Sequence, residues 1–170
     1  MLLTKLYVTR LPGGLPHEGR LIAGHAIFPC ALGRSGVTHD KREGDGATPA
    51  GRFRLLYFYL RRACLLNTPW RLTRPQDAWC DDQHSFLYNH ALKLPTRLNH
   101  EEMWRVDNLY DVVGVMDYNI RPVTRSRGSA IFFHLATSNL DPTAGCVALR
   151  HEDMRKLLPR LSHQVCVYVT

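Results

Sequence analysis

The chain has 170 residues, a length typical of one domain and sufficient to bury about two thirds of the surface that the unfolded chain exposes. Hydrophobic residues make up 45% of the sequence and charged residues 22%, as in ordinary globular proteins, and no apolar run approaches the ~20 residues of a membrane-spanning helix. The net charge of +7 favours an anionic partner, but the basic residues are scattered, which argues against nucleic acid as that partner.

Short segments typical of β-strands dominate the chain, because they are rich in β-branched and aromatic residues and lie between Gly, Pro and Asn/Asp clusters. They are residues 3–9, 20–28, 52–60, 111–119, 129–134 and 164–170. Helical signals occur at residues 99–110, where Asn99 and Glu102 resemble a capping box, and at 151–161, where acids precede bases. The sequence therefore predicts one mainly β domain over residues 1–170, a β-sandwich or partly closed barrel with two or three helices.

Two further segments carry weaker information. Residues 68–98 mix prolines with WCDDQ and FLYNH, and a loop of this length inside a compact domain is usually functional, so we expect a lid or the wall of a cleft. The first residues lack the apolar region and the small-residue cleavage site of a secretory signal. If the substrate lies outside the cytoplasm, export depends on residues outside this chain or on another route.

The cysteines direct attention to one turn. The five positions, 30, 64, 80, 146 and 166, are odd in number and lack CxxC spacing, which argues against a disulfide framework or a zinc knuckle. Packing is the simplest role for all of them except Cys146, which lies in PTAGCV. There Gly145 lets the backbone approach a ligand, and the turn leaves amide N–H groups free to face an oxyanion. His134, twelve residues earlier, ends an apolar strand and is the base that such a thiol needs.

Two alternatives stay open on these residues alone. A histidine at a strand end and a cysteine in a turn can both be ordinary packing residues. A metal site is a second alternative, with four possible ligands: His134, Asp141, Cys146 and His151. Their spacings match no familiar zinc pattern, so we expect neither a metal nor another cofactor.

A second motif favours a reactive thiol over these two alternatives. The stretch GDGATPAGRF (residues 44–53), taken together with FFH (132–134) and PTAGCVAL (142–149), resembles the catalytic domain of the L,D-transpeptidases, the YkuD family. In that family a glycine-rich loop precedes a core strand, and a strand-end His is followed by a Ser/Thr-x-Gly-Cys turn. The resemblance covers about residues 4–170.

The resemblance implies a cysteine acyltransferase that acts on peptidoglycan in cell wall biogenesis and cell shape. Cys146 would be the nucleophile and His134 the base, lowering the pKa of the thiol. Gly145 with Thr143 would shape the oxyanion hole, and a backbone carbonyl would hold the imidazole ring. The thiol would attack a carbonyl on the L-centre of a diamino acid in a donor stem peptide, and an amine of an acceptor stem would take the acyl group. Carbapenem-type inhibitors would acylate the same thiol.

The sequence departs from the family pattern at two positions. Ala144 stands where most members have His, and Ala148 stands where most have an Arg that meets a substrate carboxylate. Arg150 is the nearest replacement for this Arg, and His39 and Arg42 are further candidates for lining the cleft. Together with Thr143 and Ala144, these three residues form the predicted substrate-binding set.

Several further questions stay open at the level of sequence. Asp81, Asp82 and Asp117 are possible partners for a substrate ammonium or ordinary turn caps. The reaction is a third-to-third crosslink, a rarer crosslink through a first-position diamino acid, or hydrolysis by an L,D-carboxypeptidase or endopeptidase. A peptidoglycan-binding module without activity would be expected to lack the Cys or the His. The substrate implies the periplasm or cell envelope, and the oligomeric state is not predicted.

Overall fold

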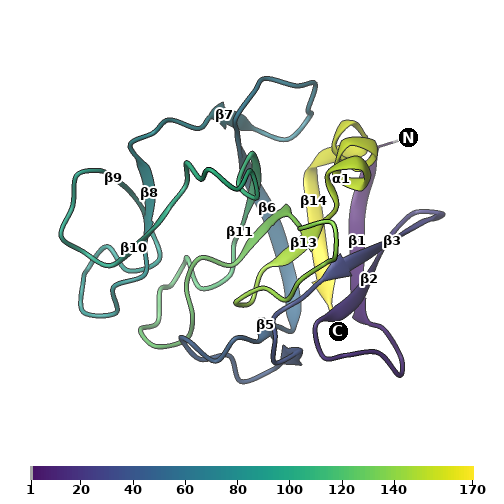
Figure 1. The fold of residues 1–170 in the computed structure, drawn as a ribbon, viewed down its shortest axis with the longest axis horizontal. Helices are drawn as coiled ribbons and strands as arrows, with labels where there is room; N and C mark the ends of the chain where they lie inside the picture. Colours follow the sequence, from purple (N-terminus) through teal and green to yellow (C-terminus); the bar gives the residue numbers. More distant parts are fainter. Residues whose placement is uncertain (1) are drawn as a thin grey trace.

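Strands form most of the ordered structure in a computed structural model that describes residues 2–170 (Figure 1). The strands of the main sheet are β1 (Leu3–Arg10), β2 (Glu18–Ala23), β3 (Ala26–Ala31), β6 (Gly51–Leu60), β7 (Trp70–Leu72), β11 (Val112–Met116), β12 (Phe132–Leu135), β13 (Val147–Leu149) and β14 (Leu161–Val169). The other strands are β4 (Val37–Thr38), β5 (Thr48–Pro49), β8 (Asp77–Cys80), β9 (Ala91–Lys93) and β10 (His100–Glu102). One α-helix, α1 (His151–Leu157), and one 3-10 helix, η1 (Leu158–Arg160), complete the secondary structure of residues 2–170.

The main sheet closes on itself. Its nine strands follow the order β11-β12-β13-β3-β2-β1-β14-β6-β7, and β11 also pairs antiparallel with β6. Apolar side chains from β1, β2, β6, β12, β14 and α1 form the larger hydrophobic core. Burial alternates along β2 because successive side chains of a strand point to opposite faces of the sheet. The prediction of a mainly β domain with a partly closed barrel is confirmed.

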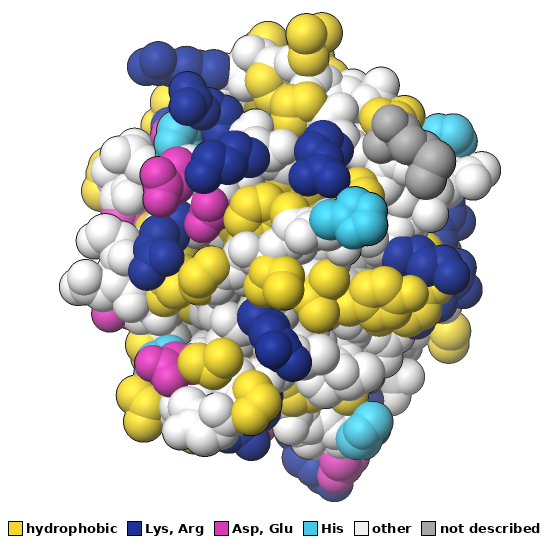
Figure 2. Space-filling view, turned by 90° about the vertical axis from the view of Figure 1, so that its right-hand side faces the viewer, with side chains coloured by type: hydrophobic (Ala, Val, Ile, Leu, Met, Phe, Trp, Pro, Cys, Tyr) yellow, Lys and Arg dark blue, Asp and Glu magenta, His cyan; other side chains and the backbone are white. Residues whose placement is uncertain are grey.

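The face around β1, β2 and β3 carries no single charged cluster. Figure 2 shows Lys and Arg side chains spread over this face between hydrophobic and His side chains. Tyr7, Leu15 and Ile27 are among the exposed apolar residues of these strands and their connections. No helix within residues 2–170 is long and apolar enough to cross a membrane.

The predicted elements agree with the structure in most places. The strand expected over residues 20–28 is two strands, because the chain turns at Gly24, whose φ is +66°, and β2 pairs with β3 as a hairpin. The helix expected at 151–161 is confirmed as α1 followed by η1.

The helix expected at residues 99–110 is wrong, and with it the count of two or three helices. His100–Glu102 instead form β10, which pairs antiparallel with β8, and the next residue, Met103, is fully buried. Asn99 and Glu102 gave a local capping signal, but a capping box contributes only about 1 kcal/mol. Strand pairing and the burial of Met103 outweigh it.

Residues 68–98 are ordered and form one side of the molecule. Here β8 lies between β9 and β10 in a second, three-stranded sheet, on the left of Figure 1. The buried carboxylate of Asp77 in β8 accepts hydrogen bonds from Lys93 in β9 and from Arg71 in β7, so it links this sheet to the main sheet. A smaller hydrophobic core joins the sheet to the barrel, and it contains Trp79, Met103, Tyr110, Phe132 and Cys146.

Candidate active site

The turn before Cys146 is fixed by Thr143. The backbone N–H of Thr143 donates to Leu32 O at 2.9 Å, and its carbonyl accepts from the N–H of Arg34 at 3.0 Å. The Thr143 hydroxyl donates to Cys146 O at 2.7 Å and accepts from the N–H of Gly145 at 3.1 Å. The short side chain therefore holds both ends of the turn, which a larger or apolar residue would not do.

Gly145 is required because the two sequence motifs touch at this residue. Its φ is +144°, which L-residues rarely adopt, and a Cβ built on it would lie 2.8 Å from the carbonyl oxygen of Ala47. Ala47 belongs to the GDGATPAGRF loop. This loop is held in turn by Asp45, which accepts hydrogen bonds from the N–H groups of Arg42 and Ala47 at 2.7 and 2.8 Å.

Cys146 is a buried thiol within hydrogen-bond distance of two backbone groups. Its Sγ donates to Ala130 O at 3.2 Å and accepts from the N–H of Phe132 at 3.3 Å. Burial raises the pKa of Cys146 to about 12, so the side chain is a neutral thiol at physiological pH.

His134 lies on the neighbouring strand with its ring held in place. β12 and β13 run parallel with His134 opposite Ala148, which brings the imidazole to the level of the turn. Its Nδ1 lies 2.8 Å from Leu135 O, and the Tyr110 ring meets it edge-on at 5.1 Å. Donation from Nδ1–H to this carbonyl leaves Nε2 free to accept a proton. Burial lowers the pKa of His134 to about 4, so the ring is neutral.

These values correct one expectation. We expected His134 to lower the pKa of the Cys146 thiol, but burial raises it, and within residues 2–170 no hydrogen bond joins the two side chains. The resting site therefore holds a neutral thiol and a neutral imidazole rather than an ion pair.

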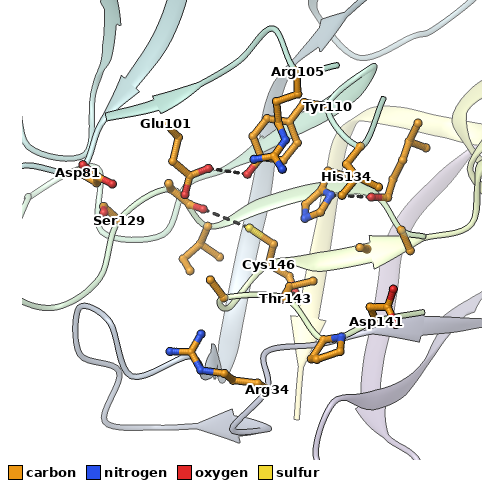
Figure 3. A pocket seen from close by; sticks show the side chains of 18 of the residues that line it. Arg34, Asp81, Glu101, Arg105, Tyr110, Ser129, His134, Asp141, Thr143 and Cys146 are labelled. Atoms are coloured by element: carbon orange, nitrogen blue, oxygen red, sulfur yellow. Dashed lines mark hydrogen bonds between the residues drawn. The ribbon is translucent and has the colours of Figure 1, made fainter. Parts of the chain in front are cut away.

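Cys146 and His134 line the same cavity, which has a volume of about 480 Å³ (Figure 3). Thr143, Ala144 and Ala148 also contribute to its wall. The charged side chains around it are Arg34, Lys41, Arg105, Glu43, Asp81, Glu101 and Asp141. A nucleophile, a base with a free nitrogen and a pocket large enough for part of a peptide can together carry out acyl transfer.

Comparison with known families shows to which family the chain belongs. A model of the L,D-transpeptidase catalytic domain, YkuD, matches residues 17–169. The chain belongs to this family. It is therefore an enzyme of the L,D-transpeptidase type, whose substrate is peptidoglycan. No curated protein matches the chain.

The structure of this L,D-transpeptidase domain separates the predicted substrate-binding residues into two groups. Thr143 and Ala144 line the cavity, whereas Arg150, His39 and Arg42 do not. Arg150 is the N-cap residue of α1, and its Nε donates to Ser138 O at 3.0 Å. The substrate-binding roles of all five residues stay predictions, but their position in the cavity wall favours Thr143 and Ala144 for this role.

Other lining residues of this L,D-transpeptidase domain were not found from the sequence. Arg34 follows β3 and reaches the cavity because Gly33 pairs with Thr143 of the nucleophile turn. Glu101, Arg105 and Tyr110 all fell in the helix that the sequence predicted, and none of them was expected to line a cavity. The backbone carbonyl within hydrogen-bond distance of the His134 ring is Leu135 O, an atom that no residue type reveals in a sequence.

The four possible metal ligands are not all brought to one place. Within residues 2–170, no group of three His, Cys, Asp or Glu side chains is arranged to hold a metal ion. His151, one of the four possible ligands, lies at the start of α1 and does not line the cavity.

Two backbone N–H groups of the turn are candidates for binding an oxyanion. The N–H of Gly145 is already used by the Thr143 hydroxyl. In the part of the chain that the structure describes, the N–H groups of Ala144 and Cys146 donate to no acceptor. We therefore expect the oxyanion to be bound by these two groups, with Gly145 shaping the turn.

Replacing Gly145 with alanine is expected to destabilise the domain by about 2–4 kcal/mol, which for this size lowers Tm by roughly 4–16 °C. The reason is the positive φ together with the contact to Ala47 O. Gly13→Ala is the matched control, since Gly13 has φ +75° but nothing within 4 Å of its Cβ position. Thermal unfolding of the two variants distinguishes them, and equal shifts would show that the contact with Ala47 is unimportant.

Proposed function

We propose that this L,D-transpeptidase domain transfers the acyl group of a peptidoglycan stem peptide through a thioester on Cys146. The observation that supports this best is the shared cavity of Cys146 and His134, with the imidazole ring held by Leu135 O. The substrate implies that the domain works in the periplasm or elsewhere in the cell envelope.

The first half of the reaction follows from the neutral state of both groups. As Sγ attacks the carbonyl carbon on the L-centre of the diamino acid, the thiol proton moves from its position near Ala130 O to Nε2 of His134. The oxyanion accepts from the N–H groups of Ala144 and Cys146. The C–N bond then breaks, and the imidazolium gives its proton to the leaving amine of the D-amino acid. Because burial lowers the pKa of His134, its protonated form is a strong acid at this step.

The second half regenerates the thiol. An amine of an acceptor stem attacks the thioester, His134 takes a proton from it, and the same proton returns to Sγ when the C–S bond breaks. The acceptor position decides whether the product is a third-to-third crosslink or one through a first-position diamino acid. Water in place of the amine gives the L,D-carboxypeptidase or endopeptidase reaction with the same residues.

Intact mass after exposure to purified muropeptides tests the proposal. We expect an adduct on Cys146 equal to the donor stem without its terminal D-amino acid. Product analysis with and without an amine acceptor then separates transfer from hydrolysis. The absence of an adduct with any muropeptide, together with no consumption of substrate, would leave a non-catalytic peptidoglycan-binding module as the remaining function.

Arg34 is the residue that we expect to bind a carboxylate of the donor. It lines the cavity, its side chain donates to Gly44 O at 3.1 Å, and it forms no ion pair within residues 2–170. Loss of a charge-assisted hydrogen bond at an accessible site costs about 1.5 kcal/mol, so Arg34→Ala is expected to raise KM for muropeptide roughly tenfold.

Arg150→Ala is the comparison for this measurement, because the sequence predicted Arg150 for the same role. Steady-state kinetics of both variants with one muropeptide decides between them. A raised KM in Arg150→Ala with normal KM in Arg34→Ala would support the sequence-based prediction and reject ours.

A further inference from the structure

Three carboxyl groups line the cavity, and we call them the acidic end: Glu43, Asp81 and Glu101. They lie close enough together that the charge of Glu43 raises the pKa of both other groups. They come from separate parts of the chain, namely the segment before the GDGATPAGRF loop, the end of β8 and strand β10. Figure 3 shows Asp81 and Glu101 on one side of Cys146 and His134 on the other. A substrate carbonyl at Cys146 therefore has the base on one side and the acidic end on the other.

In the described residues no ion pair neutralises these carboxyl groups, and only the nearby charge of Arg105 partly offsets the negative charge at Glu101. Glu43, Asp81 and Glu101 form no ion pair within residues 2–170, although three cationic side chains line the same cavity. Lys41 is paired with Asp45 at 2.5 Å, and Arg105 with Asp107 at 2.5 Å. Lys41 and Arg105 are thus paired with other carboxylates, and Arg34 donates to Gly44 O.

Neutral donors satisfy part of the acidic end only. Glu43 accepts from the hydroxyls of Tyr88 and Ser129 at 2.5 and 2.6 Å. Glu101 accepts from the hydroxyl of Tyr110 at 2.5 Å. Asp81 accepts no hydrogen bond from another residue in the described part of the chain, and its Oδ1 is buried without a partner.

This arrangement stores unfavourable electrostatic energy. Burial raises the pKa of Asp81 and of Glu101, and the negative charge of neighbouring carboxyl groups raises both pKa values further. A buried acceptor without a donor costs about 1–3 kcal/mol, and more when it is charged. A cation bound between these groups would recover that energy, since an opposite charge at short range stabilises the ionised carboxylate.

We propose that the acidic end binds the side-chain ammonium of the diamino acid whose carbonyl is attacked by Cys146. This inference rests on the proposed function and names the substrate class: a donor stem whose diamino acid has a free side-chain amine. A primary ammonium is compact and has three N–H donors, which matches three carboxyl groups of different origin. The carbonyl and the ammonium belong to the same residue, so one diamino acid reaches both Cys146 and the acidic end.

The bound ammonium also acts on the nucleophile. After burial, the negative charge of Glu101 is the next cause that raises the pKa of Cys146. An ammonium between Glu101 and the thiol offsets this charge as Sγ becomes negative during attack. Donors without that ammonium should therefore react more slowly as well as bind more weakly.

Two donor peptides test the proposal: a stem tetrapeptide with the side-chain amine of its diamino acid free, and the same peptide with that amine acetylated. The quantity measured is the ratio of kcat/KM for adduct formation on the full chain. One charge-assisted hydrogen bond corresponds to about 1.5–3 kcal/mol, so wild-type protein is expected to prefer the free amine by roughly ten- to a hundredfold. Asp81→Asn and Glu101→Gln are each expected to reduce this preference at least fivefold.

Asp82→Asn is the matched control. Asp82 is adjacent to Asp81 in sequence but does not line the cavity. Its Oδ1 accepts a hydrogen bond from the N–H of His84. It should keep the wild-type preference. Glutamine at 101 can still accept from Tyr110, so a folding defect does not obscure that variant. The ratio compares two donors on one protein sample, which removes differences in the folded fraction.

The outcomes of this experiment distinguish a failure of the acidic-end proposal from a failure of the proposed function. Equal rates for both donors on wild-type protein, with an adduct from each, overturn the acidic-end proposal and leave the thioester intact. An undiminished preference in both Asp81→Asn and Glu101→Gln overturns it as well. No adduct from either donor, with a mixture of natural muropeptides also inert, overturns the proposed function and this inference together.

Discussion

Replacement of Cys146 by alanine is expected to remove all measurable acyl transfer and all adduct formation while leaving the domain folded. Sγ forms the bond to the substrate, and no other thiol lines the cavity in the described residues. The main structural loss is the acceptor for the N–H of Phe132, which costs about 1 kcal/mol. Intact mass after incubation with muropeptide, together with thermal unfolding, checks both parts of this expectation.

Cys64→Ala is the control for the alanine variant of Cys146. Cys64 is exposed, whereas the other cysteines are buried, so its replacement disturbs packing least. It is expected to keep both adduct formation and turnover. A carbapenem should acylate the wild type and Cys64→Ala but not Cys146→Ala. Normal turnover by Cys146→Ala would end the argument for a thioester.

His134→Gln is expected to lower the rate of acyl transfer by roughly 10²–10⁴-fold, the usual contribution of a positioned general base. Alkylation of Cys146 by iodoacetamide at high pH should persist in this variant, because the thiolate then forms without a base. Rates of adduct formation and of alkylation, measured on the same preparations, separate proton transfer from damage to the turn. An unchanged rate of acyl transfer would show that His134 is not the base.

The pH dependence of the wild type follows from the same two groups. The pKa of His134 is lowered to about 4, so the ring stays an active base as pH falls through 6.5, and activity should decline only near pH 4. The pKa of Cys146 is raised to about 12, so alkylation should keep increasing with pH well beyond 9, the ordinary value for a thiol. A kcat/KM profile that falls with a midpoint near 6.5 would contradict the buried, neutral imidazole.

Patterns along the chain were sufficient to predict the fold class, and together with the family resemblance they gave Cys146 and His134 as candidates for the two reacting groups. The strands have alternating or continuous apolar residues, and the nucleophile turn has a residue composition that few other functions need. The positions of Cys146 and His134 in one cavity agree with this prediction. Such features are local, so a sequence displays them directly.

The rest of the site depends on contacts between distant segments. Glu101 reaches the cavity because β10 pairs with β8, and Arg34 because Gly33 pairs with Thr143. Leu135 acts through a backbone carbonyl, which every residue has. The raised pKa of Cys146 results from burial in a core shared by two sheets. Local signals carry no information on any of these, which also explains why Arg150 was favoured over Arg34.

The contact of Gly145 with the carbonyl of Ala47 has a consequence for which changes the domain tolerates. It joins two segments far apart in sequence, and because protein interiors are close-packed, a displacement of one segment is passed to the other. A substitution or insertion in the loop at residues 44–53 that moves Ala47 is therefore expected to move the backbone before Cys146 as well. The two motifs are thus expected to tolerate change only together.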